Sequence, residues 1–335
     1  MVSYRKLLIS ALLLAAVLTA GLFLWHRARQ APEAVRLLPE GEMLIYADLT
    51  PIHLFSTTKT RPIQLEGDYR NFVEQTGIQF ERDLEQVAMS RRDAPDGKDT
   101  ESSEIFVGKF DGPRLSAYLQ KSAAHADTYR NHLIFSIPHQ GHLVRVCILD
   151  GRRVAVTNME NPAPMRAMID SSFHPPAGPS LLKDYYGGIP ATSLAWLIAR
   201  IPAKSQAAQF PDGWSFDFLE NTVTVASLRY QGDVLFKAGV IAPSESDAKR
   251  ITDAATGFLL ISRSAAQALN PGGSDPDVKA AFDSVQVQQN KNVAVITATL
   301  SQRVLKKLVT EAQPESTAPV PSPSPSAPKR RRRRR

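Results

Sequence analysis

The chain has 335 residues, a formal net charge of +7 and a single cysteine, Cys147. Residues 329–335 are one lysine and six arginines, so this tail carries the entire net charge and the rest of the chain sums to zero. The charge therefore excludes a basic nucleic-acid-binding domain, because the basic groups form a tail and not a patch on a fold. The single cysteine excludes an intramolecular disulfide, and its apolar neighbours predict a buried, unreactive thiol.

An apolar segment opens the chain, and its nineteen residues, Leu7–Trp25, include no charged side chain. As a helix they would measure roughly 28 Å, close to the hydrocarbon thickness of a bilayer. We therefore expect residues 1–29 to form an uncleaved signal anchor whose transmembrane helix contacts the lipid bilayer. A cleaved signal peptide is the alternative and requires small residues before the cut. Leu18 lies at the third position before a cut after Ala20, which favours the anchor.

The charges around this segment bear on its orientation. Arg5 and Lys6 precede it, and Arg27 and Arg29 follow it, so the positive-inside rule discriminates weakly. A short basic leader before the first apolar run is typical of an export signal. We expect a single-pass protein of the cytoplasmic (inner) membrane with a periplasmic or extracellular body. Alanines spaced four residues apart within the segment would also permit a transmembrane homodimer.

The middle of the chain is predicted to contain two α+β halves, 38–173 and 192–312. A linker over 30–37 precedes them, and a loop rich in proline and glycine, 174–191, joins them. Apolar patterns predict strands at Met43–Leu49, Ile105–Phe110, Leu133–Ile137, Leu143–Leu149, Val154–Thr157, Ser193–Ile201, Thr222–Tyr230, Val234–Ile241, Ser284–Gln288 and Val293–Thr299. Helical spacing predicts helices at Asp68–Ala88, Asp111–Ser122, Pro162–Ser171, Ser244–Ser264 and Ser301–Glu311, with irregular segments at 89–103 and 202–220.

Each predicted half ends in a hairpin followed by a helix: Leu143–Thr157 with Pro162–Ser171, and Ser284–Thr299 with Ser301–Glu311. Hairpin-linked strands favour a mostly antiparallel sheet with packed helices, because parallel strands require long crossover connections. The expected fold class is therefore α+β. A duplication that gives two similar halves and a single meandering α+β domain both remain open.

The start of the first half, Leu38–Leu49, reads LPEGEMLIYADL. This leucine-proline pair, short polar spacer and strand ending in an aspartate resemble the start of uncharacterised bacterial single-anchor envelope proteins. The resemblance covers about a dozen residues. It implies a membrane anchor followed by an extracytoplasmic α+β body, and it implies no activity.

The sequence carries no recognised catalytic or cofactor motif: G-x-S-x-G, G-x-G-x-x-G, a Walker lysine and H-E-x-x-H are all missing. We therefore predict no catalytic residue and no cofactor, and we expect a protein that is not an enzyme. Tyr185 and Tyr186 precede two glycines and could line a ligand cleft between the halves, or could belong to an ordinary hinge loop.

Two groups of side chains in the sequence could provide metal ligands. His132, His139 and His142 would suit zinc or copper if a hairpin brought them together; otherwise they are partly exposed side chains on a strand and its turn. An acidic loop would suit calcium, although its spacing does not match an EF-hand and a solvated loop is the alternative. Its members are Asp93, Asp96, Asp99, Glu101 and Glu104. We predict no metal site from either group.

The C-terminal segment combines a spacer rich in proline and serine, 313–328, with the polybasic tail 329–335. The spacer is predicted to be extended and disordered. The candidate polyanion-binding residues are Lys329, Arg330, Arg331, Arg332, Arg333, Arg334 and Arg335. They would contact anionic lipid, glycan or nucleic acid, or else form a solvated charge run without a partner. The function expected is a structural or interaction role in the envelope; the alternative is a ligand-binding or assembly module that uses a cleft between the halves.

Overall fold

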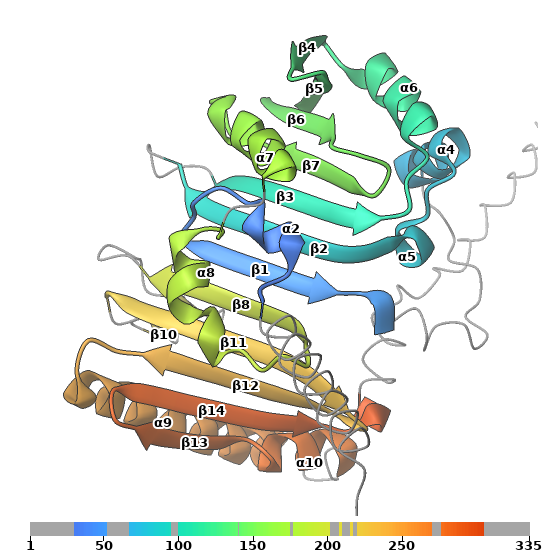
Figure 1. Cartoon of the computed structure of the whole chain (residues 1–335). Coiled ribbons are helices and arrows are strands. Elements are labelled where there is room, and N and C mark those ends of the chain that lie inside the picture. Colours follow the sequence, from blue (N-terminus) through green and yellow to red (C-terminus); the bar gives the residue numbers. More distant parts are fainter. Residues whose placement is uncertain are drawn as a thin grey trace, which may run out of the picture.

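The structure, a computed structural model, describes residues 30–51, 67–94, 100–139, 141–174, 177–201, 208–209, 215–216, 220–269 and 276–304. It confirms an α+β fold built on one large antiparallel sheet. Twelve strands pair in the order β13-β14-β12-β11-β8-β1-β2-β3-β7-β6-β5-β4 (Figure 1). The strands of both predicted halves therefore belong to a single sheet, and the halves meet where β1 pairs with β8.

The first half of the sheet comprises β1 (Met43–Asp48), β2 (Leu84–Asp93), β3 (Thr100–Gly108), β4 (His125–Tyr129), β5 (His132–His139), β6 (His142–Ile148) and β7 (Arg153–Thr157). Its helices are α2 (Glu33–Arg36), α4 (Gly67–Thr76), α5 (Phe80–Asp83), α6 (Gly112–Ser122) and α7 (Ala163–Phe173). Asp111 caps α6, because its Oδ1 accepts a hydrogen bond from the Arg114 N–H at 3.1 Å.

The second half comprises β8 (Ser193–Ile201), β11 (Thr222–Gln231), β12 (Asp233–Ile241), β13 (Gln286–Asn290) and β14 (Val293–Leu300). Its helices are α8 (Ser180–Tyr185), the short 3-10 helix η1 (Tyr186–Gly188), α9 (Glu245–Leu269) and α10 (Pro276–Asp283). A separate pair, β9 (Ala208–Gln209) and β10 (Ser215–Phe216), lies outside the large sheet. Ser244 caps α9, since its Oγ accepts a hydrogen bond from the Asp247 N–H at 3.1 Å.

Helices cover the sheet on both faces. On the front face, which carries Leu44 and Ala88, the short helices α2 and α8 and the longer α7 complete the main core (Figure 1). On the opposite face, α6 packs against Phe135 and Val146 at one end of the sheet. The helix α9 packs against Ala294 at the other end.

Two sequence expectations about the first half were wrong. The helix predicted over Asp68–Ala88 ends at Thr76, and after the short α5 the chain continues as β2. Because β2 lies between β1 and β3, both its faces carry apolar side chains, and their spacing also fits a helix. The loop predicted over 89–103 consists largely of the ends of β2 and β3, whose polar residues Arg92 and Glu101 form an ion pair at 2.7 Å.

The two connecting segments also differ from expectation. The predicted linker contains α2, in which Ala34 and Val35 are 1% and 0% exposed. The predicted loop over 174–191 contains α8, and its Leu181 and Leu182 are 1% and 2% exposed. Both segments are too short for helical periodicity to be read from sequence, and tertiary burial holds them in place.

The predicted anchor 1–29, spacer 313–328 and polybasic tail 329–335 lie outside the described residues. Within the described residues, none of the helices is both long and apolar enough to cross a membrane. The predicted closing helix begins with residues 302–304, of which Val304 is buried, and the rest of it is not described.

Candidate functional site

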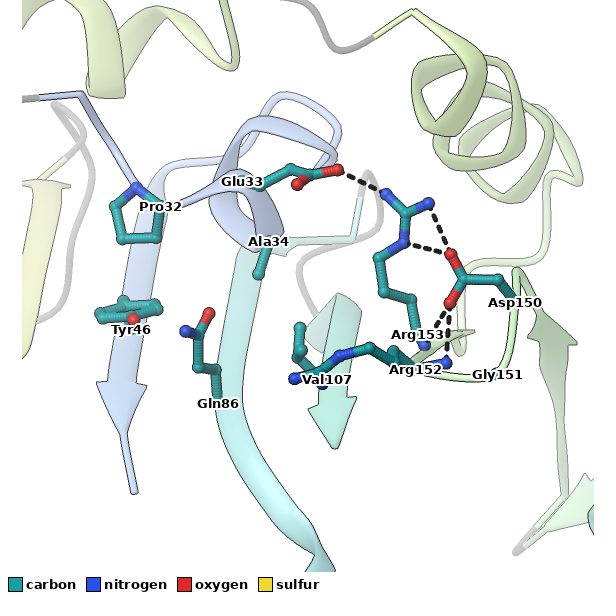
Figure 2. A pocket seen from close by; sticks show the side chains of 10 residues that line it. All are labelled: Pro32, Glu33, Ala34, Tyr46, Gln86, Val107, Asp150, Gly151, Arg152 and Arg153. Carbon is teal, nitrogen blue, oxygen red and sulfur yellow. Dashed lines mark hydrogen bonds and ion pairs between the residues drawn. The ribbon is translucent and has the colours of Figure 1, made fainter. Parts of the chain in front are cut away.

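A pocket of about 590 Å³ lies between α2 and the turn that joins β6 to β7 (Figure 2). Its lining comes from α2 and the residue before it, from three central strands, and from the turn. The residues are Pro32, Glu33, Ala34, Tyr46, Gln86, Val107, Asp150, Gly151, Arg152 and Arg153. All of them belong to the first half of the chain, so the pocket is not the cleft between halves that the sequence suggested.

The sheet forms the floor of the pocket. Gln86 of β2 lies opposite Val107 of β3, and Val107 lies opposite Arg153 of β7, so these side chains share one face. Tyr46 of β1 continues this floor toward the centre of the sheet, with Pro32 above its ring (Figure 2). The helix α2 stays over the floor because its apolar side chains are anchored in the main core.

An ion-pair network closes one side of the pocket. The Arg153 guanidinium donates from Nη1 to Glu33 Oε1 at 2.5 Å and from Nε to Asp150 Oδ2 at 2.7 Å. Asp150 Oδ1 in turn accepts the backbone N–H groups of Arg152 and Arg153, each at 2.8 Å. The neighbouring Arg152 guanidinium forms an ion pair with Glu85. This network ties α2 to the β6–β7 turn and leaves both arginines engaged with carboxylates.

The electrostatic consequence is clearest at Asp150. Partial burial alone would raise the pKa of its carboxyl, but hydrogen bonds from the Arg153 side chain and from two backbone N–H groups outweigh that effect. The pKa of Asp150 therefore lies below its usual value. A carboxylate held ionised in this way, with its oxygens already accepting hydrogen bonds, is a poor general acid or base near neutral pH.

Two uncharged polar groups face the pocket without partners of their own. Within the described part of the chain, neither the Tyr46 hydroxyl nor the Gln86 side-chain amide takes part in a hydrogen bond to a protein group. Tyr46 is 5% exposed, and its ring stacks on Trp196 with centroids 5.6 Å apart. Burial, followed by the nearby charge of Asp48, raises the pKa of Tyr46, so its hydroxyl stays protonated and can donate.

The three histidines are not brought together. His139 and His142 lie opposite each other across the β5–β6 hairpin, as expected. His132 is at the other end of β5, seven residues and roughly 23 Å away at about 3.3 Å per residue. There its ring packs edge-on against Phe173, with centroids 5.6 Å apart. Among the described residues no group of His, Cys, Asp and Glu side chains is placed to hold a metal ion.

The acidic group is only partly described, because Asp96 and Asp99 lie outside the described residues. Glu101 is neutralised by its ion pair with Arg92. Glu104 lies further along β3, where burial raises the pKa of its carboxyl. The described members thus lie on two strands, Asp93 on β2 and the two glutamates on β3, and they form no metal-binding group.

Tyr185 and Tyr186 pack against the main core and do not line the described pocket. The Tyr186 ring meets Trp196 edge-on, with centroids 5.6 Å apart, so it supports the same indole that stacks on Tyr46. Cys147 is buried as predicted, and burial raises the pKa of its thiol to about 12. The polyanion-binding candidates Lys329–Arg335 lie outside the described residues, so their role stays a prediction.

Sequence reasoning missed the pocket because its residues carry no motif. Glu33 and Ala34 fell in the predicted linker, Gln86 in a predicted helix, and Asp150–Arg152 in a predicted turn. The one local signal is Asp150 itself, since an aspartate followed by glycine at a turn readily accepts backbone N–H groups. Asp150 is linked to α2 through Arg153, whose bond to Glu33 joins residues more than a hundred positions apart in the chain.

No protein-family model matches this chain, and no curated protein matches it. Among solved structures, it resembles crystal form IV of TP0453, with a TM-score of 0.43, 10% sequence identity, and coverage of 83% of this chain and 96% of that one. Crystal form III of TP0453 gives a TM-score of 0.43, 10% identity, and coverage of 84% and 99%. Crystal form I gives 0.42, 10%, and coverage of 84% and 98%. This similarity is too distant to carry an argument about function.

Proposed function

We propose that this chain is a membrane-anchored, non-enzymatic envelope protein with a structural or interaction role, held in the cytoplasmic membrane by Leu7–Trp25. The observation that carries the proposal is the burial of α2, which begins only a few residues after the apolar segment. Val35 and Leu37 are 0% and 1% exposed, so the body is packed from Glu33 onward. Only eight positions separate Trp25 from Glu33, a reach of at most about 28 Å. Such a short connection would keep the body close to the bilayer surface.

Membrane fractionation with topology reporters tests this proposal. Alkaline phosphatase and a fluorescent protein would be fused separately to the C-terminus of the full chain. We expect the chain to sediment with the inner membrane and to give phosphatase activity, because the reporter would lie outside the cytoplasm. A matched variant with Leu13→Arg and Val17→Arg should leave the membrane fraction, since charges in the apolar segment are costly in a bilayer. A wild-type chain found in the soluble cytoplasm would overturn the proposal.

The tail proposal is that Lys329 and Arg330–Arg335 contact a polyanion, most simply anionic lipid headgroups. Each basic residue near an anionic membrane contributes about 1 kcal/mol, and salt weakens this attraction. Deleting 329–335 should therefore reduce salt-sensitive binding to anionic vesicles and to DNA. A control in which lysines replace the six arginines keeps the charge and should retain most of the binding. Equal weak binding by wild type and deletion would contradict the proposal.

A second candidate function is a small-ligand-binding module, which the pocket beside α2 favours. The volume is typical of ligand sites, and its ionisable groups are paired with one another, which suits binding better than proton transfer. This candidate moves the ligand site from the expected cleft between the halves into the first half alone. Calorimetric titration of the full chain with small neutral and charged molecules tests this candidate.

We further propose that the two halves are structural repeats. Outward from the β1–β8 pairing, the strands run β1-β2-β3-β7-β6-β5-β4 in one direction and β8-β11-β12-β14-β13 in the other, so five successive strands of each half can correspond. A short helix, α2 or α8, precedes the first strand of each half. Leu38-Pro39 comes before the Leu44–Tyr46 segment, LIY, and Ile189-Pro190 before Leu194–Trp196, LAW. An alignment of the first half with the second half across homologous chains would test this. If the halves are repeats, Leu38-Pro39 and Ile189-Pro190 should align with each other.

A further inference from the structure

We propose that the pocket between α2 and the β6–β7 turn binds an uncharged saccharide, recognised by the Tyr46 hydroxyl and the Gln86 amide. This inference rests on the second function proposed above, ligand binding in this pocket, and it names the class of ligand. It does not depend on the membrane anchor or on the polybasic tail.

The charges of the pocket exclude an anionic ligand. The lining contains two arginines, Arg152 and Arg153, and two carboxylates, Glu33 and Asp150, so its formal charge is zero. Both guanidinium groups already form ion pairs. Two further carboxylates lie next to the floor, because Asp48 is opposite Gln86 in the β1–β2 ladder and Glu85 binds Arg152. An anion would meet no free cation there.

The same geometry disfavours a cationic ligand. Asp150 accepts three hydrogen bonds, two from backbone N–H groups and one from Arg153 Nε, and Arg153 Nη2 makes a further ion-pair contact with Oδ2 at 2.6 Å. These fill the acceptor capacity of a carboxylate, which has about four lone-pair sites. A ligand cation would have to displace Arg153 and so break the link between α2 and the turn. Apart from the second carboxylate oxygen of Glu33 at the rim, the groups left for a ligand are uncharged.

The hydrogen-bonding groups match those of a sugar. A phenol hydroxyl and a carboxamide can each donate and accept, and a sugar hydroxyl does the same. Tyr46 and Gln86 lie on adjacent strands at the floor of the pocket, so neighbouring hydroxyls of one ring could reach both (Figure 2). The second carboxylate oxygen of Glu33 is a further acceptor at the rim. A volume of about 590 Å³ leaves room for one or two sugar rings.

The topology argues against a peptide, the other uncharged ligand that offers donors and acceptors. Peptides commonly bind a sheet by adding a strand to a free edge. The strands that floor the pocket, β1, β2 and β3, are each paired on both sides. Their backbone groups are therefore occupied, and recognition in the pocket must come from side chains.

Binding would be measured by calorimetry on the full chain in lipid nanodiscs, because glycoside detergents would present saccharides of their own. A charge series on one ring supplies the probes: N-acetylglucosamine and its β-1,4-linked dimer, then cationic glucosamine and anionic glucuronic acid. A tripeptide without charge, triglycine amide acetylated at its N-terminus, serves as the competing class. We expect the neutral sugars to bind, the dimer more tightly, and the two charged sugars to bind more weakly.

Two variants locate the site. Tyr46→Phe keeps the ring on Trp196 and removes only the hydroxyl, so affinity should fall roughly 2- to 10-fold, the loss of one uncharged hydrogen bond. Tyr186→Phe removes a hydroxyl from a second ring that contacts the same indole, outside the pocket lining, and should leave affinity unchanged. Gly151→Phe should abolish binding, since a Cβ there meets no atom within 4 Å and the added ring can fill the pocket.

Each other outcome overturns the inference in a distinguishable way. If the acetylated triglycine amide binds, the sugars do not, and Gly151→Phe blocks the peptide, the ligand class is wrong while ligand binding in this pocket stands. If neutral sugars bind equally to wild type and Gly151→Phe, the site is wrong. If none of the probes binds to a wild-type chain that shows native circular dichroism, both the inference and the ligand-binding function fail.

Discussion

Tyr46 and Trp196 lie directly opposite each other in the β1–β8 ladder, and their rings stack with centroids 5.6 Å apart and planes 28° apart. This pair sits where the two halves of the chain meet. Trp196 is 4% exposed and also packs edge-on against Tyr186. The seam between the halves is therefore an ordinary piece of sheet with a buried aromatic core, and not an interface between separate domains.

The first prediction is that Trp196→Ala destabilises the whole body in one step. Removing a buried tryptophan side chain costs about 3–5 kcal/mol, because contacts are lost and a cavity remains. Since the seam is continuous, both halves should unfold together in a urea titration followed by circular dichroism. Tyr186→Phe, which keeps its ring on Trp196, should change the free energy of unfolding little. Two separate transitions in the wild-type chain would contradict the shared core.

The second prediction concerns α2, which the sequence did not distinguish from a linker. Leu37→Ala should lower the free energy of unfolding by about 2–5 kcal/mol, because Leu37 is 1% exposed in the main core. The matched control is Leu133→Ala on β5, where the side chain is 44% exposed and the expected change is within about 0.5 kcal/mol. Equal effects of the two substitutions would show that α2 is not packed as described.

Much of the fold could be predicted from the sequence, because most hairpin strands carry apolar segments bounded by turn residues. The β6–β7 and β13–β14 hairpins were found at nearly their observed bounds. The central strand β2 was missed, since apolar residues on both of its faces give a spacing that also fits a helix. The edge strand β4 was missed for the opposite reason: all of its residues but Tyr129, which is only partly buried, are exposed, so no pattern marks it.

The candidate site could not be predicted at all. Its defining link joins Glu33 to Arg153 across 120 positions, and each residue alone looks like an ordinary surface charge. The Tyr46 hydroxyl and Gln86 amide become notable only because the fold places them in a hollow without partners. Sequence reasoning did identify the strand that carries Tyr46. It did not predict the structure of the other segments that line the pocket.

The third prediction uses Cys147 as a test of core integrity. Burial raises the pKa of its thiol to about 12, so the reactive thiolate is a fraction of about 10⁻⁴ at pH 8. A maleimide should therefore label the native chain very slowly and the urea-unfolded chain fast. Gly112→Cys combined with Cys147→Ala places a thiol in open space at the start of α6 and should react quickly when native. Rapid native labelling of Cys147 would mean that the sheet opens near β6.

The last prediction concerns the pH dependence of the network that holds α2. The folded-state pKa of Asp150 is depressed by Arg153 and by two backbone N–H groups. Its contribution to stability is therefore fully present above the unfolded carboxyl pKa of about 3.9, and it is lost as the pH falls through the lower folded value. Asp150→Asn should be less stable than wild type at pH 7, and the difference should shrink below about pH 4.

Thermal unfolding of both proteins between pH 2 and pH 8 measures that difference directly. Asp253→Asn is the matched control, because Asp253 pairs with Lys249 one turn away on α9 and its side chain is 63% exposed. Exposed helix pairs contribute little, so this variant should follow wild type at every pH. A gap between wild type and Asp150→Asn that stays constant down to pH 2 would mean that Asp150 stabilises the turn through its shape alone, and that its charge does not hold Arg153 against α2.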